Sequence, residues 1–354
     1  MKTARLRYFA ACNSEEGFYS FYPDVFTKDL THIYIIKGGP GTGKSTLMRR
    51  VADRAEIKGY QVEEIYCSSD PESLDGVIAR GSEESFAVLD GTAPHVTEME
   101  LPGARDEILY VGDFWSSEIL KQQKKMILQE SQARANAYRR LYRYLRAAGQ
   151  CERVQHESAS SLLNRHKLTD TVSHILARYP VGVDFSMQTM LTSSIGMRGM
   201  MRLNTFEHAS DTVFSISDCA GTAWDLLDEV FRQAQNRRLR VWVSYDPLIP
   251  AHFDAICLPD CRLSFVKAKR SEIGEVGKVC RISMKRYLFA DGYQDAEEIF
   301  ATAQKAKERL MTVVLQTLMQ IRELHFSIES RYVSAMDFHA MEVYTEQWLE
   351  KILP

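Results

Sequence analysis

The stretch that decides the fold runs from residue 31 to residue 52 and reads THIYIIK-GGPGTGKS-TLMRRVA. Its central octet, residues 38–45, fits the pattern G-x-x-x-x-G-K-[ST] of a phosphate-binding loop. The residues before the octet are mostly apolar and β-branched, as in a strand. The residues after it place Leu47, Val51 and Ala55 on one helical face. A strand, a glycine-rich turn and a helix in this order predict a site for nucleotide phosphates at the turn.

The residue types of this loop match the chemistry of a bound triphosphate. Glycines at 38, 41 and 43 permit backbone turns that direct successive N–H groups toward phosphate oxygens. A helix that begins near Gly43 adds the positive end of its dipole. We expect Lys44 to bind the β- and γ-phosphates and the Ser45 hydroxyl to bind Mg²⁺. The expected nucleotide-binding residues are Gly38, Gly39, Pro40, Gly41, Thr42, Gly43, Lys44, Ser45 and Thr46.

A carboxylate that shares the Mg²⁺ ion with Ser45 is expected at the end of a neighbouring strand. Residues 86–91 read FAVLDG, and we predict that Asp90 is this ligand. The alternative is an aspartate that only starts a turn before Gly91. Asp113 is a weaker candidate, because a glycine separates it from the preceding apolar run.

Asp70 is the candidate catalytic base. It follows a predicted strand at residues 62–67, and ligands of doubly wound sheets gather at the carboxyl ends of the strands. Its carboxylate could position a water molecule or accept a proton from an acceptor hydroxyl. It could equally cap a helix that has Pro71 at its first position. For His95, a contact with the γ-phosphate is one interpretation, and a loop histidine without a catalytic role is the favoured one.

The second half of the chain resembles the first but lacks its charged loop residues. Residues 213–227 align without gaps on residues 33–47, which places Trp224 at the position of Lys44 and Asp225 at that of Ser45. Tryptophan removes the cation and fills the space of a phosphate, and an aspartate repels phosphate. We therefore predict an internal duplication whose second loop does not bind a nucleotide in the usual way.

Two later features support the duplication. The predicted strand at residues 240–245, followed by Asp246, matches the strand that leads to Asp70. Residues 263–267 align on residues 86–90, so that Lys267 replaces Asp90. A lysine at this position would repel Mg²⁺.

Long helical segments end each half. Residues 116–148 have apolar side chains at helical spacing and stop at Gly149, and a second helix is expected to follow up to about Leu176. In the second half, helices are expected at about residues 295–333 and 337–353. We predict an α/β fold with P-loop NTPase-type sheets flanked by helices, internally duplicated, with a long helical hairpin in each half. The predicted halves are residues 1–188 and 189–354.

Composition and charge exclude several classes of protein. The chain has 354 residues, 45% of them hydrophobic, and a formal net charge of −3, which excludes disordered, collagen-like and disulfide-scaffold proteins. Residues 121–146 form a locally basic helix with eight Lys or Arg and one acidic residue. A solvated helix face is the favoured interpretation, and a contact with nucleic acid or an acidic partner is the alternative.

Cysteines and hydropathy also limit the interpretation. The seven cysteines form no C-x₂-C pair, so we expect free thiols rather than a zinc site. No run approaches the ~18 apolar residues that a membrane-spanning helix requires. We expect a cytoplasmic protein that makes no membrane contact.

Four segments together resemble a poorly characterised bacterial group of tandem P-loop ATPases. They are residues 9–18 (FA…N…GF), 36–46 (IKGGPGTGKST), 67–77 (CSSD…SLDGV) and 89–96 (LDGTAPHV). The resemblance implies ATP binding and hydrolysis, and it supplies no pathway or substrate. Members of the group usually keep a lysine-bearing loop in both halves, and this chain departs from that pattern at Trp224.

The sequence therefore favours a Mg²⁺-dependent ATPase with one active site, in which Lys44, Asp90 and Asp70 are the catalytic residues. ATP is favoured over GTP because no guanine-reading Asn/Thr-Lys-x-Asp motif occurs. One alternative is a small-molecule or nucleotide kinase with Asp70 as the acceptor base, in which Asp75 or the basic helix helps to bind the acceptor. The other alternative is a nucleotide-gated switch without turnover. The helical hairpins are candidate contacts for a protein partner.

Overall fold

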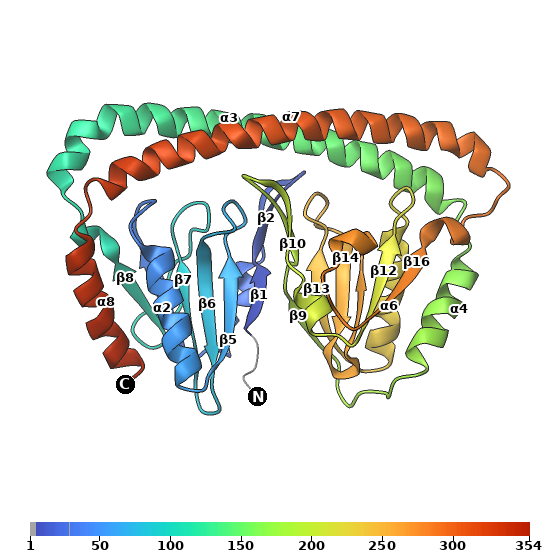
Figure 1. Ribbon diagram of the computed structural model, residues 1–354, viewed down its shortest axis with the longest axis horizontal. Helices are drawn as coiled ribbons and strands as arrows, with labels where there is room; N and C mark the ends of the chain where they lie inside the picture. The colour runs from blue at the N-terminus through green and yellow to red at the C-terminus, as the bar shows by residue number, and fades with distance from the viewer. Residues whose placement is uncertain (1–4, 28) are drawn as a thin grey trace.

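The computed structural model describes residues 5–27 and 29–354, and it shows an α/β protein built from two similar halves (Figure 1). The first half contains β1 (Leu6–Phe9), β2 (Ala11–Ser14), β3 (Gly17–Ser20), α1 (Tyr22–Val25), β4 (His32–Lys37), α2 (Lys44–Ile57), β5 (Gln61–Tyr66), β6 (Leu74–Arg80), β7 (Ser85–Asp90), β8 (Asp106–Tyr110) and the 3-10 helix η1 (Val111–Phe114). The second half contains β9 (Ser186–Thr189), β10 (Ser193–Gly196), β11 (Gly199–Arg202), α5 (Thr205–His208), β12 (Thr212–Ser217), α6 (Ala223–Asn236), β13 (Arg240–Tyr245), β14 (Phe253–Leu258), η2 (Pro259–Cys261), β15 (Leu263–Val266), η3 (Arg270–Glu272), β16 (Lys278–Ser283) and η4 (Met284–Tyr287). After the first half come α3 (Ser117–Ser160) and α4 (Arg165–Leu176), and after the second come α7 (Tyr293–Val333) and α8 (Phe338–Ile352).

The two sheets have the same topology. The first has the order β1-β5-β6-β7-β4-β8, and the second has the matching order β9-β13-β14-β15-β12-β16. Both sheets are mixed, because β6 and β14 run antiparallel to their two neighbours. The other strands of the first sheet are parallel to one another, so the loops after β4, β5 and β7 meet at one edge of the sheet. The predicted duplication and the α/β class are confirmed.

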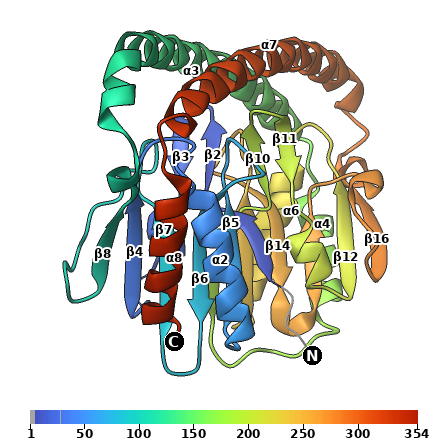
Figure 2. The same cartoon turned by 60° about the vertical axis from the view of Figure 1, so that its left-hand side comes forward.

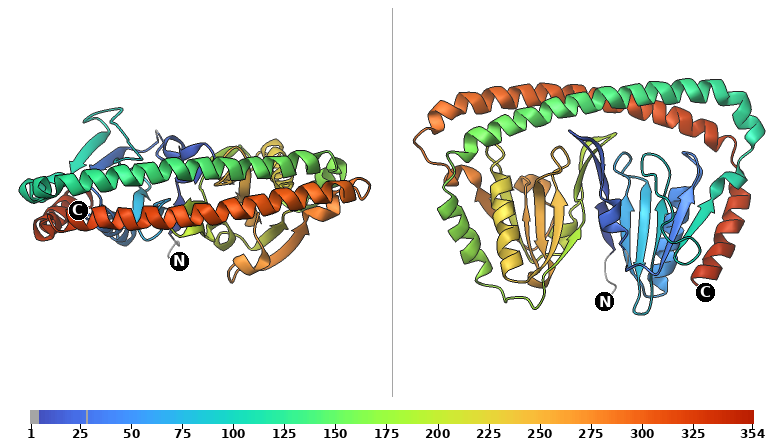
Figure 3. Two further views of the ribbon diagram at one scale, coloured as in Figure 1. Left: turned by 90° about the horizontal axis from the view of Figure 1, so that it is seen from above. Right: turned by 180° about the vertical axis from the view of Figure 1, so that it is seen from behind.

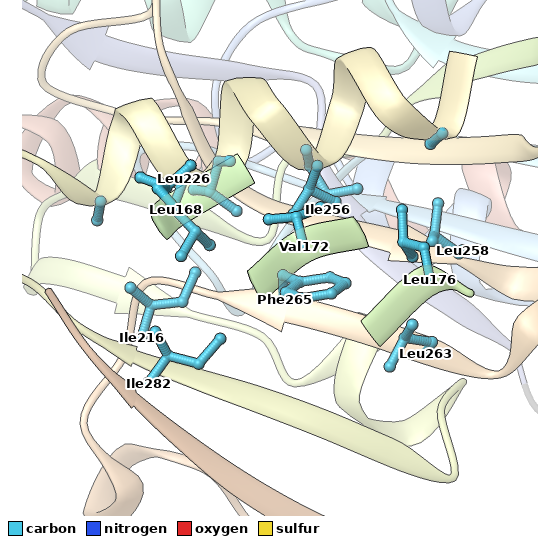
Figure 4. Packing of buried hydrophobic residues seen from close by; sticks show 14 of the residues in the cluster. Leu168, Val172, Leu176, Ile216, Leu226, Ile256, Leu258, Leu263, Phe265 and Ile282 are labelled. Atoms are coloured by element: carbon cyan, nitrogen blue, oxygen red, sulfur yellow. The ribbon is translucent and has the colours of Figure 1, made fainter. Parts of the chain in front are cut away.

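Each central strand is buried on both faces, which explains its continuous apolar sequence. In β4, Ile33 and Ile35 belong to the core between the two sheets, and Tyr34 and Ile36 belong to the core under the outer helices. The second half has a comparable outer core, in which side chains of α4 and α6 pack on the sheet (Figure 4).

The two long helices span both halves, so that the short helix after each one packs on the opposite half. α3 and α7 lie side by side above both sheets and run in opposite directions (Figures 1 and 3). As a result α4, which follows the first half, packs on α6 of the second half. In the same way α8 lies beside α2 on the outer face of the first sheet (Figure 2), where Trp348 contacts Tyr34 with ring centroids 5.1 Å apart. The sheet of each half is therefore covered by a helix that follows the other half in the chain.

This arrangement corrects two predictions. α3 does not stop at Gly149 but continues to Ser160, and a side chain at Gly149 would collide with the Glu15 carboxylate, so this glycine permits close packing rather than ending the helix. The helices of one half also do not form a hairpin with each other, because α3 pairs with α7 along its length. The predicted boundary between residues 188 and 189 falls inside β9.

Two further observations concern the chain as a whole. All seven cysteines are free thiols, as expected from their spacing. Within residues 5–27 and 29–354, every helix is too short or too polar to cross a membrane.

Candidate functional site

The loop between β4 and α2 has the conformation that its glycines predict. Gly41 and Gly43 have φ angles of +67° and +82°, a region that residues with a Cβ atom rarely adopt. Helix α2 begins at Lys44, directly after Gly43, as expected from the sequence. The loop therefore directs backbone N–H groups and the positive end of the α2 dipole toward the same edge of the sheet.

Lys44 and Asp90 lie together at this edge. The strand register pairs Asp90 with Ile36, so the end of β7 lies beside the start of the loop. Lys44 is only 9% exposed, and its Nζ atom donates a hydrogen bond to the Gly39 carbonyl oxygen at 2.6 Å. The same nitrogen lies 3.5 Å from Asp90 Oδ2. A buried ammonium with one carbonyl and one carboxylate partner is well placed to bind an anion such as a phosphate.

The residues predicted for Mg²⁺ provide oxygen atoms of the type that this ion prefers. Asp90 Oδ1 accepts hydrogen bonds from the backbone and hydroxyl of Thr92, which fixes the carboxylate and leaves Oδ2 toward Lys44. Ser45 Oγ accepts a hydrogen bond from the Leu74 backbone N–H at 2.9 Å. Mg²⁺ usually takes one or two protein ligands together with phosphate and water oxygens, so Ser45 and Asp90 fit this role.

Two cavities meet at Lys44. One, of about 450 Å³, is lined by residues 40–43 of the β4–α2 loop, by the start of α2 and by Asp70. The other, of about 610 Å³, extends over the loop that follows β7. Both cavities are lined by Pro40, Lys44, Cys67, Ser69, Asp75, Asp90, Met197 and His325.

The long helices α3 and α7 cover the site on the side of the β4–α2 loop. A Cβ atom at Gly41 would lie 2.6 Å from Glu329 Cγ of α7, so the loop and α7 pack directly together. Burial raises the pKa of Glu329, and the nearby Asp70 carboxylate raises it further. Burial lowers the pKa of His325, as does the Arg134 guanidinium of α3, whose Nη1 atom lies 3.4 Å from His325 Nδ1. These long helices thus supply charged and titratable groups to the site.

The structure separates the two interpretations of Asp70. Residues 71–73 form a turn and β6 begins at Leu74, so there is no helix for Asp70 to cap, and that interpretation is wrong. Its carboxylate instead accepts hydrogen bonds from the Glu72 backbone and the Ser73 hydroxyl, and it lines the smaller cavity. Asp70 therefore remains a candidate base.

His95 is not an isolated loop side chain. Its Nε2 atom lies 2.8 Å from Asp75 Oδ2, and its ring stacks on Tyr22 with centroids 4.6 Å apart. Both members of the pair are more than nine-tenths buried, and both line the larger cavity. Asp113 lies in η1 and lines a separate shallow cavity near Ala340, away from Lys44.

The second half also reaches into the site of the first. The turn between β10 and β11 brings the Met197 backbone N–H to the Ser69 carbonyl oxygen at 2.8 Å, and Met197 lines both cavities. Arg198 forms an ion pair with Glu72 at 2.5 Å. The site is therefore built from both halves, although the β4–α2 loop comes from the first alone.

In the corresponding loop of the second half, the Asp218 side chain binds the backbone N–H groups of the loop. Asp218, at the position of Gly38, accepts hydrogen bonds from the backbone N–H groups of Gly221 at 3.1 Å and Ala223 at 2.8 Å. These groups belong to the turn that holds phosphate in a phosphate-binding loop. In the second half these N–H groups are therefore bonded to an internal carboxylate.

The Trp224 side chain is buried next to this second loop. It is 1% exposed and stacks on His252 with ring centroids 4.1 Å apart. Lys267 Nζ lies 5.2 Å from the centroid of the Trp224 ring and 2.5 Å from Asp246 Oδ2. Burial opposes the charge of Lys267, yet Asp246 raises its pKa above the ordinary value. The Trp224 ring is therefore buried between His252 and Lys267, the counterpart of Asp90.

The strand register corrects one detail of the repeat. Val266 pairs with Ser215 as Leu89 pairs with Ile35, which confirms that Lys267 replaces Asp90. Asp246, however, directly follows β13 as Cys67 directly follows β5. The backbone N–H groups of Cys67 and Asp246 bond Ser73 and His252 in the same way. Asp246 therefore corresponds to Cys67 and not to Asp70, because aligning the two Asp-Pro pairs shifts the loop by three residues.

Sequence reasoning missed part of the site. In the sequence Arg134 is only one charge of the basic stretch, and no motif points to His325, Glu329 or Met197. A single sequence does not show that α3 and α7 pack together over the site. Asp218 had a signal, since the gap-free alignment places it on Gly38.

Comparisons with protein-family models, with curated proteins and with solved structures found no match for this chain.

Proposed function

We propose that this chain is a P-loop ATPase that binds Mg·ATP at the loop of its first half and hydrolyses it there. The observation that carries the proposal is the place of Lys44, whose buried ammonium lies between a loop carbonyl and Asp90 at the junction of two cavities. The resemblance of its loop segments to the tandem P-loop ATPase group agrees with this proposal. The closure of the second loop by Asp218 and Trp224 supports a single site.

Each residue has a role in this proposal. Backbone N–H groups of the loop and Lys44 hold the β- and γ-phosphate oxygens and stabilise the charge that spreads over them in the transition state. When Mg²⁺ is bound, Ser45 and Asp90 hold it and it neutralises charge on the same oxygens. Asp70 orients the attacking water molecule from the smaller cavity. Glu329 faces the same cavity from α7 and is the competing candidate for this task.

The test is phosphate release from ATP by the purified full chain in the presence of Mg²⁺. We expect release that needs no acceptor and that is lost in Lys44→Ala. The matched control is Lys58→Ala, at the exposed far end of α2, which should keep the wild-type rate. Bound ATP with no release would support the nucleotide-gated switch instead, and no binding at all would refute the proposal.

A second candidate function has one observation in its favour. The larger cavity adjoins Gly38, Pro40 and Lys44 and extends away from them over the loop after β7, and its volume of about 610 Å³ exceeds the 450 Å³ of the cavity at the start of α2. A hydrolase needs room there only for water, whereas a kinase needs room for an acceptor. Formation of ADP that depends on an added acceptor would favour the kinase.

A further inference from the structure

The larger cavity has two chemically different ends. Arg134, Tyr138 and Tyr142 of α3 line it at positions i, i+4 and i+8, so they follow one another along the same face of the helix. At 1.5 Å per residue these eight steps span about 12 Å. Arg134 contacts His325, which also lines the cavity of the phosphate loop, so the Arg134 end adjoins Lys44. Tyr138 Oη lies 3.5 Å from Ser69 Oγ, beside the wall that the two cavities share. Tyr142, eight residues from Arg134, donates a hydrogen bond to Asn13 Oδ1 and lines the larger cavity.

The Arg134 end lacks a counter-ion. Among the residues that the structure describes, no carboxylate oxygen lies within 4.0 Å of the Arg134 guanidinium, whereas Lys44 has Asp90 as its partner. Its neighbour His325 does not offset this charge. The guanidinium is half-buried and lines the cavity, unlike the exposed arginines of the basic stretch such as Arg139. An unpaired, partly desolvated cation of this kind is a recognition element for an anionic group.

The remaining wall suits a flat ring with polar edges. Tyr138 and Tyr142 stack on each other with ring centroids 5.9 Å apart, and Phe18 and Pro94 also line the cavity. The Asp75 carboxylate lies in the wall that the two cavities share, where Oδ2 is paired with His95 Nε2 at 2.8 Å, and its oxygens can also accept hydrogen bonds from amino or hydroxyl groups. A volume of about 610 Å³ lies within the range of small-molecule sites.

We propose that this cavity binds a nucleoside monophosphate, with its phosphate toward Arg134 and Lys44 and its base against Tyr138 and Tyr142. The proposal rests on the ATP binding of the proposed function, with the triphosphate in the adjoining smaller cavity, and it adds the monophosphate as an acceptor in place of water. An oxygen lone pair of the monophosphate forms a bond to the γ-phosphorus of ATP. The bond from this phosphorus to the β–γ bridging oxygen breaks, and its electron pair leaves with ADP. The products are ADP and a nucleoside diphosphate, and a dianionic acceptor has no proton to give up.

Binding is measured first without ATP, by calorimetric titration of the full chain with AMP, CMP, GMP and UMP and with the four matching nucleosides. We expect at least one monophosphate to bind at one per chain, and at least tenfold more tightly than its nucleoside, because the nucleoside lacks the anion. Arg134→Ala should weaken this binding by about tenfold to a hundredfold, the range for lost hydrogen bonds to a charged group. The matched control, Arg139→Ala, changes an exposed arginine of the same helix and should leave the affinity unchanged.

The second measurement adds ATP and Mg²⁺ to the monophosphate that binds. Phosphorus NMR should show ADP and the diphosphate of the acceptor in equal amounts. Tyr138→Ala should raise the KM for the monophosphate without changing the Kd for ATP. Arg134→Lys, which keeps the charge, should retain more affinity than Arg134→Ala, and this comparison also separates a loss of recognition from a failure to fold.

Three results would overturn the proposal. They are the absence of binding by all four monophosphates, equal affinity for nucleosides and monophosphates, and displacement of the monophosphate by ATP one for one. The last result would mean that the larger cavity holds the base of ATP itself. Failure of the proposed function is distinguishable, because the monophosphate titration contains no ATP and does not depend on Lys44-mediated ATP binding.

Discussion

Replacing Trp224 with alanine should destabilise the protein without affecting its nucleotide site. The indole is 1% exposed, and it is stacked on His252 and covered by Lys267, so its removal leaves a cavity that these neighbours fill only in part. Large-to-small changes of a buried tryptophan cost about 3–5 kcal/mol. Loss of the interaction between Lys267 and the ring contributes about 0.5–2 kcal/mol to this cost. We therefore expect the free energy of unfolding to fall by about 3–5 kcal/mol.

Equilibrium unfolding in urea, followed by circular dichroism, measures this change. Trp224→Phe is the control: it keeps an aromatic ring on His252 and should lose less than half as much stability. Binding of ATP should stay at one molecule per chain in both variants, because Asp218 still occupies the second loop. A loss of less than about 1 kcal/mol, or the appearance of a second bound ATP, would show that this position is not the closed structural unit described above.

Three other changes have defined outcomes. Asp90→Asn should raise the Mg²⁺ concentration needed for half-maximal phosphate release by at least about tenfold, because it removes a charged oxygen ligand, and an unchanged Mg²⁺ dependence would remove Asp90 from the metal site. Asp70→Asn should stop phosphate release and leave the Kd for ATP unchanged, whereas normal turnover with Asp70→Asn would shift the role to Glu329. Burial raises the pKa of Asp225, but hydrogen bonds from His156 lower it below its ordinary value. The stabilisation by the Asp225 carboxylate is therefore fully present above its unfolded-state pKa of about 3.9, and it is lost as the pH falls through the lower folded-state pKa. In acid titrations of unfolding, the difference in stability between wild type and Asp225→Asn should shrink below about pH 4. A difference that stays constant with pH would contradict this prediction.

The sequence predicted the parts of the site that are local in the chain. The strand, turn and helix around Lys44 are short-range features with strong residue preferences, and the structure has them in the predicted order, with the helix beginning at Lys44. The position of Asp90 beside Lys44 was predictable for a similar reason, because an apolar strand that ends in Asp-Gly places its carboxylate at the end of the sheet where the β4–α2 loop begins. The sequence also predicted that the second loop differs in chemistry from the first, because Trp224 and Lys267 differ in charge and size from Lys44 and Asp90.

The parts that the sequence did not predict depend on contacts between distant segments. Helical spacing fixes which face of α3 and α7 is apolar, but both possible partners, a helix of the same half or of the other half, satisfy that spacing. Arg134 and Glu329 therefore had no visible connection to Lys44. Gly149 was misjudged for a related reason, because a glycine in a helix can end it or admit a close neighbour, and only the position of Glu15 distinguishes the two.

The most direct test of the account is the number and location of bound ATP molecules. Equilibrium dialysis of the full chain with Mg·ATP should give one ATP per chain for the wild type and for Trp224→Phe, and none for Lys44→Ala. Two molecules per chain, or ATP that remains bound after Lys44→Ala, would contradict the claim that the first loop alone holds the triphosphate.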